Sequence, residues 1–267
     1  MKDIFTRSLS GLIYVSLIIA TLFIDAKWTV ILLAGIGFLV LQEFLRLVKF
    51  EKAVWLYVIY AALFILIYFQ EKFALGKSIG LLAVLANTYL AYFLFRKKDI
   101  PYTGLSIHLL SIFYIMAGIL SLTAIAFSTD SISYISRQLV SIFFLIWAND
   151  TFAYLVGVSF GKNKLFPSIS PKKSVEGFIG GIGGAIVAAL IISKYFYSEI
   201  SLTHWIILAI LAGVLGTIGD LVESKFKRKA GVKDSGKLMP GHGGVYDRLD
   251  SILYASPFIY VYLLYIM

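Results

Sequence analysis

The sequence predicts an all-α integral membrane protein with about nine transmembrane helices, a cytoplasmic N-terminus, an outside C-terminus and an active site on the cytoplasmic side. Three observations favour this fold class. The chain of 267 residues is 60% hydrophobic and 15% charged, whereas a soluble domain is about half apolar and about a quarter charged. Apolar runs recur along the whole chain at bilayer-spanning length. Basic residues are concentrated in alternate connections between these runs.

Nine apolar runs are expected to form helices, at residues 8–25, 28–48, 54–69, 74–95, 105–127, 138–158, 175–193, 203–222 and 251–267. A helix of about 20 residues crosses the hydrocarbon core. The third run is short but carries no charge. No convincing small-residue cleavage site follows the first run, so we expect a retained helix rather than a signal peptide.

The placement of basic residues predicts the orientation. With the N-terminus inside, 19 of the 24 Lys and Arg residues lie in cytoplasmic segments, and the others are Lys27, Lys72, Lys77, Arg137 and Lys194. This bias is the positive-inside pattern. It also explains the net charge of +9 without nucleic acid, because basic loops face the anionic lipids of the cytoplasmic leaflet. The absence of Cys excludes disulfides and thiolate metal sites.

The polar chemistry is concentrated in the second half of the chain. Residues 1–137 hold five expected helices and are interpreted as a scaffold, whereas residues 138–267 hold four helices and two polar cytoplasmic loops, 161–177 and 223–250. Asn149 and Asp150 are predicted to lie roughly 13 Å deep in the bilayer. Ionisable residues at such depth usually mark a functional cavity, although Asp150 could instead pair with a buried Lys.

Several carboxylates are spaced for metal binding. Asp220 and Glu223 are three residues apart and share a helix face, and Asp247 and Asp250 repeat this spacing at the expected start of the last helix. Carboxylates without Cys favour a hard cation such as Mg²⁺. We therefore predict Asp220, Asp247 and Asp250 as metal ligands and leave open a second cation. Asp250 also suits the positive end of a helix dipole without any metal.

Basic residues and glycines surround these acids. The basic side chains outnumber the acids and suit phosphate groups; they are Lys225, Lys227, Arg228, Lys229, Lys233, Lys237 and Arg248. Gly241, Gly243 and Gly244 let backbone N–H groups approach an anion. Together with a divalent cation, this set indicates phosphoryl or nucleotidyl transfer. Lys225, Lys227 and Lys229 could equally contact lipid headgroups. His242 is either a turn residue or a group that binds a ligand or handles a proton.

A GxxxG spacing at Gly180 and Gly184 predicts close helix packing rather than a ligand site. No internal repeat is found in the sequence.

Residues 224–250, SKFKRKAGVKDSGKLMPGHGGVYDRLD, resemble the signature of the CDP-diacylglycerol synthases, also called phosphatidate cytidylyltransferases. The matching positions are Ser224, Lys227, Arg228, Lys233, Asp234, Pro240, His242, Gly243, Gly244, Asp247, Arg248 and Asp250. Segments 149–162 and 170–181 also resemble that family, so the resemblance covers roughly the C-terminal half. The first hundred or so residues resemble it only in hydropathy.

The resemblance implies that CTP and phosphatidic acid give CDP-diacylglycerol and pyrophosphate, with Mg²⁺ required, on the cytoplasmic side of a bacterial inner membrane. On this basis Asp220 and Asp247 hold Mg²⁺, and the expected catalytic residues are Asp220, Asp247, Lys233, Arg248 and His242. The expected substrate-binding residues are Asn149, Asp150, Ser170, Lys172, Lys173, Ser174, Glu176, Ser224, Lys227, Arg228, Asp234, Gly243 and Gly244.

Two alternative functions remain open from the sequence. One is CTP-dependent transfer to another lipid phosphate or to a lipid alcohol. The other is an ion-coupled transporter that uses Asp150 and Asp220, although a transporter usually pairs two inverted halves and the polar residues here crowd into one half. The expected partners are CTP, phosphatidic acid and membrane lipids, without nucleic acid, and the Gly-rich helix faces are compatible with a homodimer.

Overall fold

The computed structural model describes residues 2–24, 26–50, 53–69, 76–96, 98–126, 132–241 and 243–266. Within them the chain is mainly helical. The helices are α1 (Lys2–Ile24), α2 (Ala26–Leu47), α3 (Val54–Phe69), α4 (Gly76–Phe95), α5 (Leu105–Leu110), η1 (Ser111–Met116), α6 (Ala117–Ala126), α7 (Ile132–Phe160), α8 (Val175–Ile191), η2 (Ile192–Phe196), α9 (Leu202–Ala230) and α10 (Tyr246–Tyr265). Strands β1 (Lys164–Phe166) and β2 (Ser170–Ser174) form an antiparallel hairpin between α7 and α8.

The expectation of an all-α membrane protein is confirmed. Among the described residues, six helical segments are long and apolar enough to cross a membrane, judged by length and composition: 27–47, 78–95, 105–126, 137–160, 175–196 and 202–230. Shorter apolar helices cover Gly11–Thr21 and Val54–Leu66. The count of nine spans and the sides of the two termini stay predictions.

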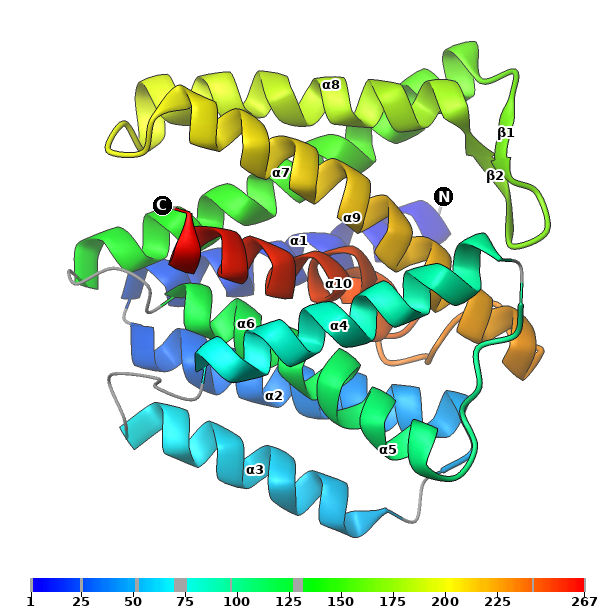
Figure 1. Cartoon of the computed structure of the whole chain (residues 1–267). Helices are drawn as coiled ribbons and strands as arrows, with labels where there is room; N and C mark the ends of the chain where they lie inside the picture. Colours follow the sequence, from blue (N-terminus) through cyan, green and yellow to red (C-terminus); the bar gives the residue numbers. More distant parts are fainter. Residues whose placement is uncertain are drawn as a thin grey trace.

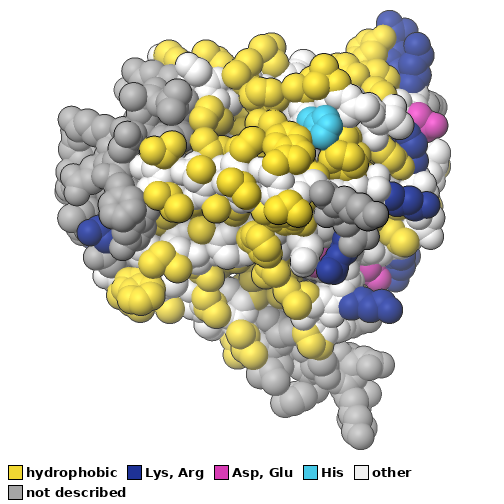
Figure 2. Space-filling view, turned by 90° about the horizontal axis from the view of Figure 1, so that it is seen from below, with side chains coloured by type: hydrophobic (Ala, Val, Ile, Leu, Met, Phe, Trp, Pro, Cys, Tyr) yellow, Lys and Arg dark blue, Asp and Glu magenta, His cyan; other side chains and the backbone are white. Residues whose placement is uncertain are grey.

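The helices lie side by side in one bundle, with α8 and α3 at opposite sides (Figure 1). α7 packs along α8, α9 packs against α8 and α10, and α10 packs on α4 and α6. The β-hairpin lies at one end of the bundle, together with the turn that joins α9 to α10 (Figure 1). Figure 2 shows apolar side chains over the middle of one face and most of the visible charged side chains at one end. The polar chemistry is thus gathered at one end of an apolar bundle.

Small residues bring α7 and α8 together as predicted. A Cβ atom on Gly180 would lie 2.6 Å from Val156 Cβ, and one on Gly184 would overlap the ring of Phe152. Only glycine allows the two backbones to approach this closely. The predicted packing role of the GxxxG spacing is therefore confirmed, and α7 is fixed where it presents Asn149 and Asp150 to the site.

The structure corrects the boundary of the second polar loop. α9 continues to Ala230 instead of ending near 222, so the loop covers 231–245 and is here named the signature loop. Lys225 Nζ donates hydrogen bonds to the carbonyls of Phe93 (2.8 Å) and Lys98, and Lys229 Nζ donates to Ile100 O at 2.8 Å. These two ammonium groups bind backbone carbonyls of the last turn of α4 and of the α4–α5 connection, and they do not line the site cavity. Gly231, whose φ of 75° is left-handed, caps the C-terminus of α9.

An aromatic cluster fixes α9 and α10 beneath the signature loop. Phe44 of α2 packs edge-on against Phe226 of α9, with ring centroids 5.4 Å apart. The hydroxyls of Tyr114 in η1 and Tyr246 in α10 are hydrogen-bonded at 2.7 Å. All four side chains are buried. The first turn of α10 is therefore anchored to the N-terminal half of the chain.

Candidate active site

A cavity of about 610 Å³ opens between α7, β2, α8, α9 and α10. Eleven of the residues that the sequence predicts for the site line it: Asn149, Asp150, Lys172, Lys173, Ser174, Asp220, Lys227, Asp234, Asp247, Arg248 and Asp250. Apolar side chains line another part of the wall, among them Trp147, Tyr154 and Phe178. Residues from segments far apart in the sequence thus meet in one cavity with a charged and an apolar lining.

Three carboxylates converge in this region. Asp220, Glu223 and Asp250 each offer an oxygen, and these oxygens all lie within 4.8 Å of one another. Glu223 is fully buried; its Oε2 contacts the ammonium group of Lys227, whereas its Oε1 has no hydrogen-bond partner among the described residues. A buried carboxylate oxygen without a hydrogen bond is costly, so the group has capacity for a cation. All-oxygen ligands suit a hard divalent ion such as Mg²⁺, and this cluster holds two of the three predicted ligands, Asp220 and Asp250, with Glu223 in place of Asp247.

Two lysines balance the charge of these acids. Lys173 Nζ on β2 lies 2.5 Å from Asp220 Oδ2. Lys227 Nζ on α9 lies 2.5 Å from Glu223 Oε2 and 2.6 Å from Asp247 Oδ1. Ser224 Oγ donates a 3.2 Å hydrogen bond to Asp220 Oδ1. Because charges in a low-dielectric site need partners, the lysines supply positive charge at the acids.

Asp247 is held differently from the three converging carboxylates. Its Oδ2 accepts hydrogen bonds from the backbone N–H groups of Gly244 (2.7 Å) and Ser235 (2.9 Å), and Ser235 Oγ lies 3.0 Å away. A Cβ on Gly243, where φ is 88°, would lie 2.6 Å from the same oxygen. The signature loop therefore wraps around Asp247. The geometry favours Glu223 over Asp247 as the third member of the carboxylate cluster.

Glu43 of α2 is absent from the site residues that the sequence predicts. Its buried carboxylate accepts hydrogen bonds from Val245 N at 3.1 Å and Tyr246 N at 2.9 Å, at the start of α10, and Ser235 Oγ lies 2.8 Å away. A Cβ on Gly236 or Gly244 would overlap this carboxylate. Glu43 thus fixes the loop that holds Asp247. These contacts join residues about 190 or more positions apart, so no local pattern signals them.

Seven predicted site residues do not line the cavity: Ser170, Glu176, Ser224, Arg228, Lys233, Gly243 and Gly244. Glu176 accepts hydrogen bonds from the backbone N–H groups of Lys162 and Asn163, which fixes the start of the hairpin segment. Arg228 donates to Ile169 O and Val232 O, both at 3.3 Å. Lys233 is exposed. Ser224 donates a hydrogen bond to Asp220 and Gly244 donates one to Asp247, as described above. His242 lies outside the described residues.

Asn149 and Asp150 present polar atoms from the α7 side. Asn149 Nδ2 donates a 3.1 Å hydrogen bond to Asp150 Oδ1, and Asn149 Oδ1 is buried with no partner in the described part of the chain. Ser174 lines the cavity and also begins α8, because its Oγ accepts a hydrogen bond from Gly177 N at 3.1 Å. The cavity therefore offers carboxylates for a cation, cationic groups for phosphates and an apolar wall for a lipid.

Comparisons with known proteins agree with this chemistry. The cytidylyltransferase family matches the chain over residues 5–266. A phosphatidate cytidylyltransferase of Staphylococcus haemolyticus is 35% identical over 192 residues, which are 70% of this chain and 71% of the relative. That of Staphylococcus saprophyticus is 37% identical over 177 residues, 66% of each chain. That of Bacillus subtilis is 49% identical over 116 residues, 43% of each chain. The resemblance predicted from the signature is confirmed.

Proposed function

Because this chain belongs to the cytidylyltransferase family, we propose that it transfers a cytidylyl group from CTP to phosphatidic acid, forming CDP-diacylglycerol and pyrophosphate. Its relatives are named phosphatidate cytidylyltransferases. The observation that carries the proposal is the single cavity in which Asp220 and Asp250 lie with Lys172, Lys173 and Arg248 beside an apolar wall. Such a cavity suits two phosphate-bearing reactants, one of which is a lipid.

The first part of the mechanism is charge placement at the acids. Asp220, Glu223 and Asp250 would hold Mg²⁺, which when bound neutralises phosphate charge during the transfer. Glu223 Oε1, which has no hydrogen-bond partner among the described residues, is the oxygen of this residue that could take part. Asp247 is the fourth carboxylate and would orient Lys227 and the signature loop through the contacts described above.

The second part is the binding of the phosphates. Lys172, Lys173, Lys227 and Arg248 face the cavity and would bind phosphate oxygens of CTP and of the lipid. An oxygen of the phosphatidate monoester attacks the α-phosphorus of CTP. A new P–O bond forms as the bond between the α-phosphorus and its bridging oxygen breaks, and pyrophosphate leaves with the electron pair. A phosphate monoester is already anionic at neutral pH, so the attacking group needs no general base.

The third part is the location of the reaction. We propose nine spans with the N-terminus inside, the C-terminus outside and the cavity on the cytoplasmic side of a bacterial inner membrane, where CTP is present. Residues 1–137 would be the scaffold and residues 138–267 the catalytic region. Glu43 supports the view that the scaffold also positions the signature loop.

Product identification tests the proposal. The purified chain in detergent is incubated with radiolabelled CTP, Mg²⁺ and phosphatidic acid, with lipid alcohols and other lipid phosphates in parallel. We expect labelled CDP-diacylglycerol and release of pyrophosphate, both lost without Mg²⁺ and both reduced in Asp220→Asn at the same Mg²⁺ concentration. Label found only on a different lipid would assign the enzyme another acceptor. No label on any lipid, together with ion-driven uptake in proteoliposomes without CTP, would reject the transferase function.

A further inference from the structure

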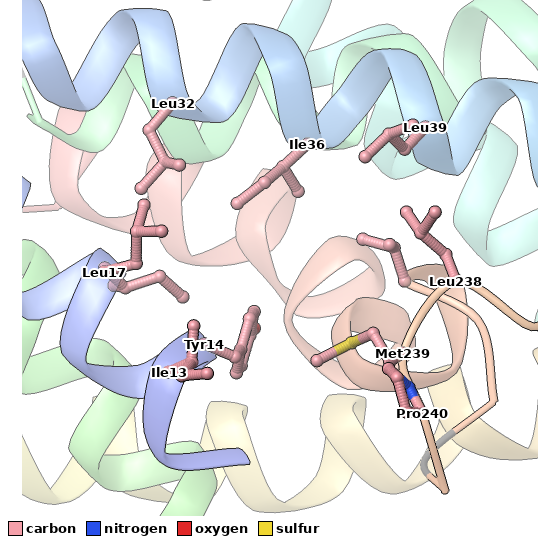
Figure 3. A pocket seen from close by; sticks show the side chains of 11 residues that line it. Ile13, Tyr14, Leu17, Leu32, Ile36, Leu39, Leu238, Met239 and Pro240 are labelled. Carbon is pink, nitrogen blue, oxygen red and sulfur yellow. The ribbon is translucent and has the colours of Figure 1, made fainter. Parts of the chain in front are cut away.

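A second, apolar pocket of about 290 Å³ lies between α1, α2 and the signature loop. Ile13 and Leu17 of α1 lie opposite Leu32 and Ile36 of α2, and Met239 with its neighbours closes one end (Figure 3). Every lining residue except Tyr14 is purely apolar. The pocket thus offers an occupant hydrophobic contacts and one hydroxyl.

Tyr14 connects this pocket to the candidate active site. It lines both cavities. Among the described residues its buried hydroxyl has no hydrogen-bond partner, and the charges of Arg248 and Asp250 act on it. Buried hydroxyls normally have a partner, so an unpartnered one at the junction of two cavities indicates a ligand that reaches across it.

We propose that the apolar pocket holds an acyl chain of the lipid phosphate substrate, and that Tyr14 binds an ester or phosphate oxygen where the chain meets the headgroup. This inference rests on the proposed function. The polar end of the lipid would lie in the larger cavity near Lys172, Lys173 and Arg248, and its chain would run between α1 and α2.

The linings of the two cavities favour a lipid over a partner helix. The pocket is apolar apart from the Tyr14 hydroxyl, and at Tyr14 it meets a cavity lined by charged side chains. A lipid phosphate joins an apolar chain to a charged headgroup and so matches both cavities, whereas an apolar helix would match only the pocket.

The acyl chain would also contact the signature loop, which positions Asp247. Leu238, Met239 and Pro240 line the pocket, and Met239 N donates a 2.9 Å hydrogen bond to Gly243 O in the same loop. Gly244 follows and donates to Asp247. The lipid chain would therefore pack on the segment that positions Asp247, so chain length is expected to affect substrate use.

Filling the pocket tests its occupant. Ile36→Trp places a larger side chain inside it, and Ile31→Trp is the matched control, because Ile31 lies on the same helix but is 48% exposed and outside the pocket. KM is measured for dioleoyl and dihexanoyl phosphatidic acid in mixed micelles at fixed CTP. For Ile36→Trp we expect KM for the dioleoyl lipid to rise about tenfold or more, which is the effect of removing about two methylenes from the buried part of the acyl chain. KM for the dihexanoyl lipid should change by less than about twofold.

Three outcomes would overturn the proposal: equal effects of Ile36→Trp on both lipids, no effect on either, or the same chain-length effect in Ile31→Trp. These differ from failure of the proposed function, in which the unchanged protein transfers cytidylyl groups to neither lipid.

Removing the Tyr14 hydroxyl tests the junction. Tyr14→Phe should raise KM for both lipids by about three- to tenfold, the effect of one lost hydrogen bond, and leave KM for CTP unchanged. The temperature of unfolding should also stay unchanged, because the hydroxyl has no protein partner. A lower unfolding temperature, or an unchanged KM for the lipids, would contradict a lipid contact.

Discussion

Replacing Glu43 by Gln tests whether a buried carboxylate of the N-terminal half holds the signature loop. Glu43 accepts the backbone N–H groups of Val245 and Tyr246 on its two oxygens. Whichever way the Gln amide turns, one of these N–H groups faces an NH₂ donor and loses its acceptor. The lost charge-assisted hydrogen bond and the unsatisfied N–H donor together lower the free energy of unfolding by about 2–4 kcal/mol. At about 2–4 °C per kcal/mol, the unfolding temperature should fall by about 4–16 °C.

The assay is thermal unfolding in detergent at one fixed heating rate, combined with cytidylyl transfer measured well below the transition. Glu199→Gln is the control, since Glu199 is exposed and its ion pair with Arg137 spans 4.0 Å; such pairs contribute less than about 1 kcal/mol. Glu43→Gln should also lower transfer, because Ser235 and Gly244 lose their fixed position around Asp247. Unchanged unfolding and unchanged transfer would refute the role assigned to Glu43.

Three further changes test other contacts. Asp220→Asn should raise the Mg²⁺ concentration for half-maximal transfer at least about tenfold, because it removes one carboxylate of the cluster; an unchanged titration would exclude Asp220 as a ligand. Lys227→Met should lower the free energy of unfolding by about 3–5 kcal/mol, because it leaves Glu223 and Asp247 without their ammonium partner. The unfolding temperature should fall accordingly, and adding Glu223→Gln should partly restore it. Gly181→Ala should destabilise by about 1–3 kcal/mol, since its Cβ would lie 2.7 Å from Asn149 Oδ1. Gly183→Ala, with no atom within 4 Å of the new Cβ, should be neutral or stabilising in the same thermal assay.

Hydropathy predicted the helices because membrane-spanning segments are long and uniformly apolar. Each of the nine expected runs is helical over nearly all of its described residues; Val48 and Ile266 lie just beyond the ends of α2 and α10. The error at the end of α9 has a physical cause. Lys225, Lys227 and Lys229 suggest a solvated loop, but their ammonium groups reach backbone carbonyls and buried acids, so the helix can continue through them.

The candidate site was predictable only where its residues form local patterns. Asp220 and Glu223 are three residues apart and fall on one helix face, which is visible in the sequence. The same spacing relates Asp247 to Asp250, but only Asp250 joins the cluster, because the signature loop draws Asp247 toward Gly244 and Ser235. The roles of Tyr14 and Glu43 rest on contacts with residues far away in the sequence, and a local spacing rule cannot predict such contacts.

The ion pairs of Lys173 and Lys227 have a consequence for how the reactants arrive. Each lysine already forms an ion pair with a carboxylate. A triphosphate without a bound cation would have to break such a pair to reach the lysine, and the carboxylate would then keep its negative charge without a partner. A divalent cation held by Asp220, Glu223 and Asp250 would supply the positive charge that the acids now take from the ammonium groups. Lys173 and Lys227 would then be available to phosphate oxygens, so the binding of the cation and the binding of the nucleotide are expected to favour each other.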